Sequence, residues 1–101
     1  MKISVDTQLG VFEYDQSHMQ ANLAPNPATN TVTVFFSNPK AGEVRLAIHT
    51  LQGQVVMSEE EHFDEGEQQY ELQLGDLSKG FYLLRVETDY GTFETLKLMK
   101  Q

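Results

Sequence analysis

Cysteine is absent from this chain of 101 residues, and basic side chains are scarce. Without cysteine the chain can form neither a disulfide framework nor a thiolate metal site. Its 7 Lys and Arg residues face 15 Asp and Glu residues, which gives a formal net charge of −8. Because nucleic-acid affinity comes mainly from neutralising phosphates with Lys and Arg, this balance argues against nucleic acid as a partner, and against anionic membranes for the same reason. An acidic surface that favours solubility is the simpler interpretation.

Long apolar runs are missing as well. No stretch approaches the length of a transmembrane helix, and the N-terminus lacks the basic-then-apolar pattern of a secretory signal peptide. If the protein is exported, we expect its N-terminal signal on a longer precursor. The chain has room for one domain with a modest core, and its hydrophobic fraction of 40% is ordinary for a folded protein.

What the sequence has is a period of two from Thr31 onward, with no helical period. In "TVTVFF", "EVRLAIHT", "QQYELQL", "FYLLRVET" and "FETLKLMK" apolar and polar residues alternate. Such alternation indicates antiparallel strands with one face on a core and the other in water. The predicted core residues are Val34, Leu46, Ile48, Leu72, Tyr82, Leu84 and Val86.

Glycines punctuate these strands. The segments "NPKAG", "LQG", "DEG" and "DYG" each place a glycine just before a strand, which predicts tight hairpin connections. "GDLSKG" is longer, and we expect an irregular or 3₁₀ turn there that buries Leu77. Gly53 and Gly80 are predicted to hold backbone conformations that other residues tolerate poorly, such as a positive φ angle at Gly53. The strand spacing predicts an all-β fold: an immunoglobulin-like antiparallel β-sandwich of about seven strands.

Residues 1–22 differ from the rest and are interpreted as a linker or the tail of a preceding module, with the β domain at residues 23–101. "KISV" could form a strand, but the polar segment after it has no sustained period. Pro25 and Pro27 lack N–H groups and favour extended neighbours, so they mark a boundary. A strand edge left open by Ile3 to Val5 would allow a strand-exchanged homodimer.

Residue patterns typical of catalytic or metal sites are scarce. His18, His49 and His62 do not have the spacing of a zinc site, and the acidic run "SEEEHFDEGE" is a solvated hairpin rather than a weak cation site in the favoured interpretation. No nucleophile–base set or phosphate loop is apparent, so we expect no enzyme activity, cofactor or metal. Of the four tyrosines that could form a sugar-stacking platform, Tyr70 and Tyr82 fall on predicted core faces, so core packing is the stronger interpretation. Phe35, Phe81 and Leu83 face away from the core, either towards a partner or under other parts of the chain.

Four segments together resemble the C-terminal sorting domains of the type IX (Por) secretion system of Bacteroidetes. "LAPNPATNTVTV" is similar to the family's opening motif, and "GEVRLAIHTLQGQVV" to its strand-turn-strand hairpin. "LGDLSKGFYLLRV" resembles its Leu-x-x-Gly-x-Tyr segment, and "GTFETLKLMKQ" its terminal strand. Ala24 stands where the family often has an aromatic residue. The residues that carry the resemblance are Pro25, Asn26, Pro27, Gly53, Leu77, Gly80, Tyr82 and Lys97.

The resemblance implies a domain that directs an attached N-terminal cargo protein to the cell surface or medium. It implies passage through the periplasm, recognition by the outer-membrane type IX translocon, and removal by a sortase-like surface peptidase that cuts in the linker. The competing hypothesis is an accessory carbohydrate-binding or adhesive β-sandwich module of a secreted protein, since the fold alone does not distinguish them. Without the downstream motifs, the Pro-Asn-Pro sequence would be an ordinary linker stop.

Overall fold

The alternating segments form two antiparallel sheets within residues 19–101, the part of the chain that this computed structural model describes. The seven strands of this part are β1 (Ala21–Ala24), β2 (Thr31–Asn38), β3 (Gly42–His49), β4 (Val55–Phe63), β5 (Gly66–Gln73), β6 (Gly80–Thr88) and β7 (Phe93–Lys100). No helix in these residues is long and apolar enough to cross a membrane. The predicted all-β sandwich is confirmed.

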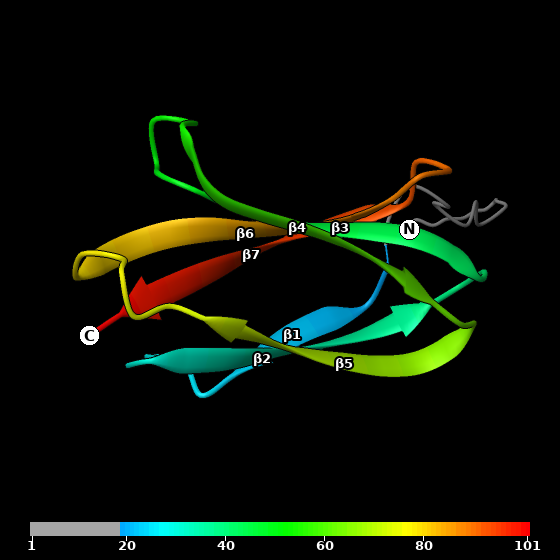
Figure 1. Cartoon of the computed structure of the whole chain (residues 1–101), viewed down its shortest axis with the longest axis horizontal. Helices are drawn as coiled ribbons and strands as arrows, with labels where there is room; N and C mark the ends of the chain where they lie inside the picture. The colour runs from blue at the N-terminus through cyan, green and yellow to red at the C-terminus, as the bar shows by residue number, and fades with distance from the viewer. Residues whose placement is uncertain (1–18) are drawn as a thin grey trace, which may run out of the picture.

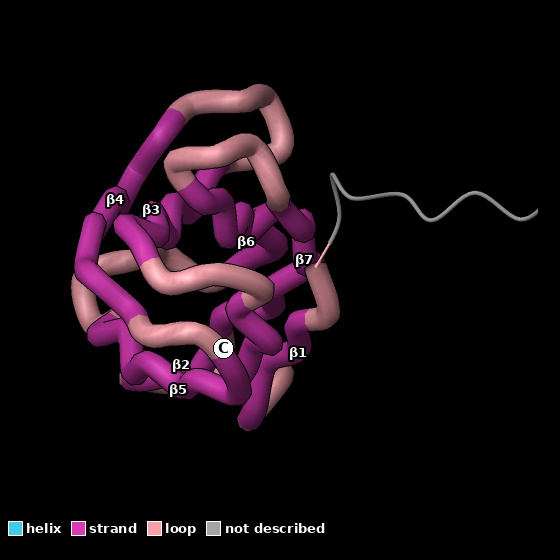
Figure 2. Tube along the Cα trace, turned by 90° about the vertical axis from the view of Figure 1, so that its right-hand side faces the viewer, coloured by secondary structure: helices cyan, strands magenta, loops and turns pink. Residues whose placement is uncertain are grey.

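The sheets lie face to face as two layers (Figure 1). One has the strand order β1-β2-β5 and the other β4-β3-β6-β7. Figure 2 shows β1 near β7 on one side of the sandwich and β4 near β5 on the other. The terminal strand β7 is therefore an edge strand of its sheet, and it lies beside the start of the domain.

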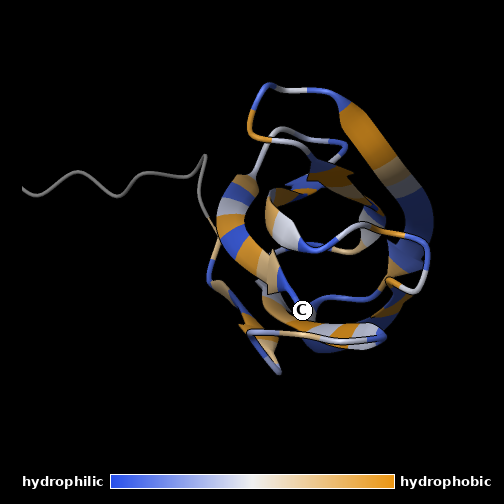
Figure 3. Cartoon of the chain, turned by 90° about the vertical axis from the view of Figure 1, so that its left-hand side faces the viewer, coloured by the Kyte–Doolittle hydropathy of each residue, from blue (hydrophilic) through white to orange (hydrophobic). Residues whose placement is uncertain are grey.

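The core fills the space between the sheets, because each strand turns alternate residues inward. All the predicted core residues are buried, and Leu46, Ile48 and Leu84 have no exposed surface at all. Hydrophobic and hydrophilic bands alternate along the strands in Figure 3. Leu77 is half-buried against this core in an irregular turn, as expected.

Two of the predicted hairpins are wrong. The turns at "LQG" and "DYG" join paired strands, but the connections at residues 38–42 and 64–66 carry the chain from one sheet to the other. The acidic run therefore spans a crossover. Asn38, which is buried, holds both connections: its Nδ2–H donates to the carbonyls of Phe63 and Asp64, and its Oδ1 accepts from the Tyr90 hydroxyl. A glycine before a strand indicates a turn but not which strand the next one pairs with.

Strand β1 is an element that the sequence analysis did not predict. It begins at Ala21, before the expected boundary at Leu23, and it pairs with β2. Met19 is buried, and its N–H donates to the Phe93 carbonyl at 3.2 Å. Four residues are too few to establish a period of two. The proposed strand at Ile3 to Val5 lies outside the described residues, as does His18.

Candidate functional site

The opening Pro-Asn-Pro motif contacts the final strand. Asn26 Nδ2–H donates to the carbonyl of Lys97 at 2.9 Å, and its Oδ1 accepts the backbone N–H of Met99 at 3.0 Å. These partners lie more than 70 positions away in sequence. Because a backbone N–H can only donate, the Met99 contact fixes which way the Asn26 amide points. The side chain of Asn26 thus occupies the place that a neighbouring strand would take.

Ala28 continues this contact with its backbone. Its N–H donates to the Met99 carbonyl at 2.8 Å, and its carbonyl accepts from the Gln101 N–H at 2.7 Å. Together these bonds form a parallel bridge between Ala28 and Lys100. An unpaired strand edge invites pairing with another chain, and covering it prevents that. The motif therefore does more than end a linker, because it covers the outer edge of β7.

Lys97 lies beside this covered edge and points away from the core. Its Nζ is 4.8 Å from the centre of the Phe81 ring, whose side chain is 47% exposed. Both groups are exposed, and a cation–π contact of this kind contributes only ~0.5–1 kcal/mol, so little free energy opposes its replacement by a partner's groups. Lys97 and Phe81 also line a shallow groove of about 240 Å³. The residues that line this groove, called here the Lys97 patch, are Asn26, Pro27, Phe81, Lys97 and Met99.

Three other predicted motif residues shape the start of β6, next to this patch. The Tyr82 hydroxyl donates to the Ser78 carbonyl at 2.7 Å, which closes the turn before the strand. The Leu77 N–H donates to the Leu74 carbonyl, and Gly80 has a φ of 146°, as predicted. Gly80 pairs with Lys100, so the next residue, Phe81, is placed beside β7. Leu77, Gly80 and Tyr82 therefore support the patch without lining it.

Gly53 lies apart from the Lys97 patch, in the β3–β4 hairpin. Its φ of 96° confirms the expected positive angle, and its N–H donates to the Thr50 carbonyl at 2.9 Å. Met99 is the patch residue that the sequence analysis missed. Its signal was the alternation in the last strand, which puts Met99 on the same face as Lys97.

Titratable groups with perturbed pKa values lie away from the Lys97 patch. The pKa of Tyr70 is raised to about 12, first because its hydroxyl donates a 2.6 Å hydrogen bond to Glu59, and also because of burial and the nearby Glu61. Burial raises the pKa of Tyr90. Because this hydrogen bond links Tyr70 on β5 to Glu59 on β4, the raised pKa lies where the edges of the two sheets meet.

The remaining candidates for chemistry are dispersed. His62 Nδ1 is 3.2 Å from the Glu43 carboxylate on an exposed surface, and His49 is half-buried on the outer face of the four-stranded sheet. Within residues 19–101 no three His, Asp or Glu side chains are grouped closely enough to hold a metal ion. Of the β4 carboxylates, Glu59 and Glu61 accept hydrogen bonds from the Tyr70 hydroxyl, and Glu60 is exposed to solvent.

Comparison with known families identifies the chain. The sequence model of the family described as "Secretion system C-terminal sorting domain" matches residues 22–101. A search of curated proteins gave no significant match. The family match covers every strand except the first residue of β1. This chain belongs to the family of type IX secretion C-terminal sorting domains.

Proposed function

We propose that residues 23–101 carry an attached N-terminal cargo from the periplasm through the outer-membrane type IX translocon, and that they catalyse no reaction. The observation that supports this is the family match over residues 22–101, which gives the domain a sorting role in a secreted protein that reaches the cell surface or medium. A sortase-like surface peptidase then removes the domain. We place the cut N-terminal to β1, because a cut within the described strands would fall on backbone that is held in the hydrogen-bonded sheets, which proteases reach less readily.

The Lys97 patch is the surface that we propose the translocon contacts. It presents a half-exposed aromatic ring, a groove, and an ammonium group that forms no ion pair with residues 19–101, all within a few ångströms of each other. Interface anchors are typically aromatic or cationic side chains of this kind. The patch also combines the first and last motifs of the domain, so it exists only when the domain has folded. A translocon that binds this patch would therefore recognise only cargo proteins whose C-terminal domain has folded.

The competing function, a carbohydrate-binding module, has weaker support. Sugar binding on a sandwich face needs neighbouring exposed aromatic rings. In residues 19–101 the exposed rings are separated: Phe35 is on the three-stranded sheet, Phe81 on the other sheet, and Tyr90 is bonded to Asn38 and Lys40 in a loop. Tyr70 and Tyr82 pack against or within the core. No aromatic platform is formed by these described side chains.

The test fuses residues 1–101 to a periplasm-targeted reporter in a bacterium with the type IX system. The intact fusion is expected at the cell surface or in the medium. Lys97→Ala should fold normally, by circular dichroism, and be exported less efficiently. Lys40→Ala is the matched control, since Lys40 also lies over an aromatic ring, that of Tyr90 at 5.3 Å, but at a different part of the molecule. An intact fusion retained in the periplasm would reject the sorting function.

Deleting residues 97–101 would not distinguish a loss of recognition from a loss of folding. Leu98 is fully buried in the core, and the hydrogen bonds of Asn26 and Ala28 to β7 would be lost as well. We expect this truncation to destabilise the domain and to block export for that reason alone. Single substitutions in the Lys97 patch separate recognition from folding.

A strand-exchanged homodimer remains a prediction. In the described residues the edge of β7 is covered by Asn26 and Ala28, and β4 carries the consecutive carboxylates of residues 59–61 along its edge. Covered and charged edges both oppose pairing with a second copy. Size-exclusion chromatography of residues 1–101 at several concentrations would measure whether the dimer forms.

A further inference from the structure

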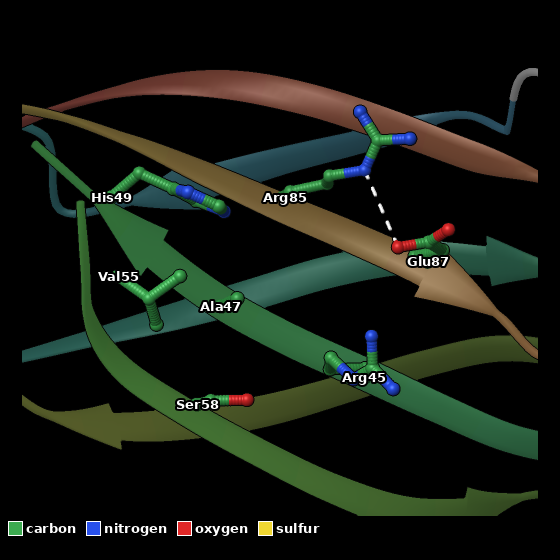
Figure 4. Close-up of a pocket in the computed structure, with 7 residues that line it drawn as sticks. All are labelled: Arg45, Ala47, His49, Val55, Ser58, Arg85 and Glu87. Carbon is green, nitrogen blue, oxygen red and sulfur yellow. Dashed lines mark hydrogen bonds and ion pairs between the residues drawn. The ribbon is translucent and has the colours of Figure 1, made fainter. Parts of the chain in front are cut away.

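Both arginines of this acidic chain lie on one surface, the outer face of the four-stranded sheet. Arg45 on β3 pairs in register with Glu87 on β6, and Ala47, the next outward residue of β3, pairs with Arg85. Arg45 and Arg85 are therefore diagonal neighbours on adjacent strands. Between β3, β4 and β6 they border a shallow pocket of about 450 Å³, called here the arginine pocket (Figure 4).

The two arginines differ in how they are held. Arg85 Nε–H donates to Glu87 at 3.4 Å, and its guanidinium carbon lies 4.0 Å from the centre of the Phe93 ring. These contacts orient Arg85 and leave its terminal NH₂ groups for a ligand. Arg45 is exposed and makes no hydrogen bond or ion pair with residues 19–101. The pocket thus combines one oriented and one unpaired guanidinium group.

The floor and one wall of the pocket are apolar. Ala47 points outward but is only 6% exposed, because the longer side chains around it cover it. Val55 on β4 is 53% exposed and forms the wall opposite β6. The first residues of β4 form a broad hydrophobic band at the upper right of Figure 3. A ligand in this pocket would meet both cationic and aliphatic groups.

We propose that the arginine pocket binds a glutamate or aspartate side chain flanked by aliphatic residues on an extended segment of a protein partner. Arg forms paired hydrogen bonds with a planar carboxylate, and the apolar surface fits the flanking side chains. A highly charged polyanion fits less well, since Glu43, Glu60 and Glu87 offset Arg45, Arg85 and Lys97 on this face and the whole chain is acidic. The partner's place in the export machinery rests on the proposed function, but the binding chemistry does not.

The experiment is an NMR titration of ¹⁵N-labelled residues 1–101 with the blocked peptide acetyl-Gly-Val-Glu-Val-Gly-amide. We expect shifts in the backbone amides around Arg45, Ala47 and Arg85. Arg45→Gln should weaken binding about tenfold, because a hydrogen-bonded charge is lost. Lys40→Gln, which removes a cation outside the pocket, should leave the affinity unchanged. The matched peptide with Gln in place of Glu should bind much more weakly than the Glu peptide.

Several results would overturn the proposal. These are equal binding of the Gln peptide, shifts confined to other surfaces, or an affinity that Arg45→Gln does not change. Inorganic phosphate that binds the pocket as well as the peptide does would indicate a phosphate site instead. Concentration-dependent shifts at the pocket without peptide would indicate that a second copy of the chain covers it.

The failure of this proposal is distinguishable from failure of the sorting function. If the intact reporter fusion is exported and the peptide does not bind, the arginine pocket is rejected and the sorting function stands. If the intact fusion stays in the periplasm, the sorting function is rejected, and the titration still decides whether the pocket binds carboxylates.

Discussion

The outer faces of the two sheets are built on the same alternation but present different side chains. In the three-stranded sheet, β2 and β5 turn outward Thr33 and Phe35 with their partners Glu71 and Gln69. Thr, Gln and Glu dominate this face, and the outward residues of β2 and β5 include no Lys or Arg. The outer face of the four-stranded sheet instead carries both arginines, Lys97 and the half-exposed ring of Phe81.

The inner faces, in contrast, are alike. Val32, Val34 and Phe36 from one sheet meet Leu46, Ile48 and Leu84 from the other, and all are essentially fully buried. Folding requires only that the inner pattern be apolar, so the outer pattern is free to vary. The difference between the outer faces therefore points to function, and it favours the four-stranded sheet as the side that meets partners.

The largest effect is expected where the two sheets share their core. Leu84→Ala should lower the free energy of unfolding by about 2–5 kcal/mol, because it removes a fully buried side chain and leaves a cavity. Val34→Ala, on the other sheet, should also destabilise the whole domain, by less because the side chain is smaller. Urea unfolding followed by circular dichroism measures both. If either variant loosened only its own sheet, giving two transitions, the core would not be shared.

The sequence predicts the core residues better than it predicts the exposed strand β4 or the pairing of the strands. Alternation identified the inward residues of β2, β3, β5, β6 and β7, because burial imposes a period of two. Strand β4 lacks a clear alternation, since Val55, Val56 and its carboxylates are exposed, so it was indicated by the glycine of "LQG" and the family resemblance alone. The division into two sheets was not predictable either, because a turn residue does not specify its strand's pairing partner.

The Lys97 patch shows a similar limit. Asn26 and Lys97 were both singled out as motif residues, yet no local pattern indicates that they touch, because they lie 71 positions apart. Their contact follows from the pairing of β1 with β2 and the position of β7 beside them. Phe81 was recognised as facing away from the core, while its proximity to Lys97 depended on the register of β6 and β7.

Asn26 provides the second largest expected effect, at the edge where the two sheets meet. Asn26→Ala should lower the free energy of unfolding by about 1–2 kcal/mol, since two hydrogen bonds to β7 are lost at a solvent-exposed site. Asn26→Asp should be at least as destabilising, because a carboxylate accepts from Met99 but cannot donate to the Lys97 carbonyl. Thermal unfolding of the variants measures both. Equal stability of Asp and Asn at this position would contradict the assigned contacts.

A substitution at Gly53 tests whether the β3–β4 hairpin of the four-stranded sheet requires a positive φ angle at that position. Gly53→Ala should lower the free energy of unfolding by about 1 kcal/mol, because a side chain is strained at a φ of 96° although open space surrounds it. Gly75→Ala is the matched control, since Gly75 also has open space around it but has no positive φ angle in the strained range. If both alanine variants were equally stable, backbone strain at Gly53 would be excluded.

Tyr70 provides a smaller and pH-dependent effect at the other seam. Its folded pKa of about 12 lies above the usual value near 10. The folded state therefore holds the phenol proton more tightly, so this stabilisation is complete below about pH 10 and is lost as the pH rises towards 12. Tyr70→Phe should remove that part of the alkaline decline, measured by urea unfolding from pH 8 to 12. Identical pH profiles of the two proteins would show that the Glu59 hydrogen bond does not hold the proton.

The smallest effect on stability is expected from replacing either of the exposed phenylalanines Phe35 and Phe81. These substitutions test the comparison of the outer faces most directly. Phe35 is 37% exposed and Phe81 is 47% exposed. Phe35→Thr and Phe81→Thr each replace the ring with a residue that is suited to strands. Their free energies of unfolding should agree within about 0.5 kcal/mol, because neither site is in the core. Export of the reporter fusion should nevertheless fall with Phe81→Thr and stay unchanged with Phe35→Thr. Equal export of both variants would mean that the difference between the faces has no part in sorting, because folding alone could then explain every contact of the Lys97 patch.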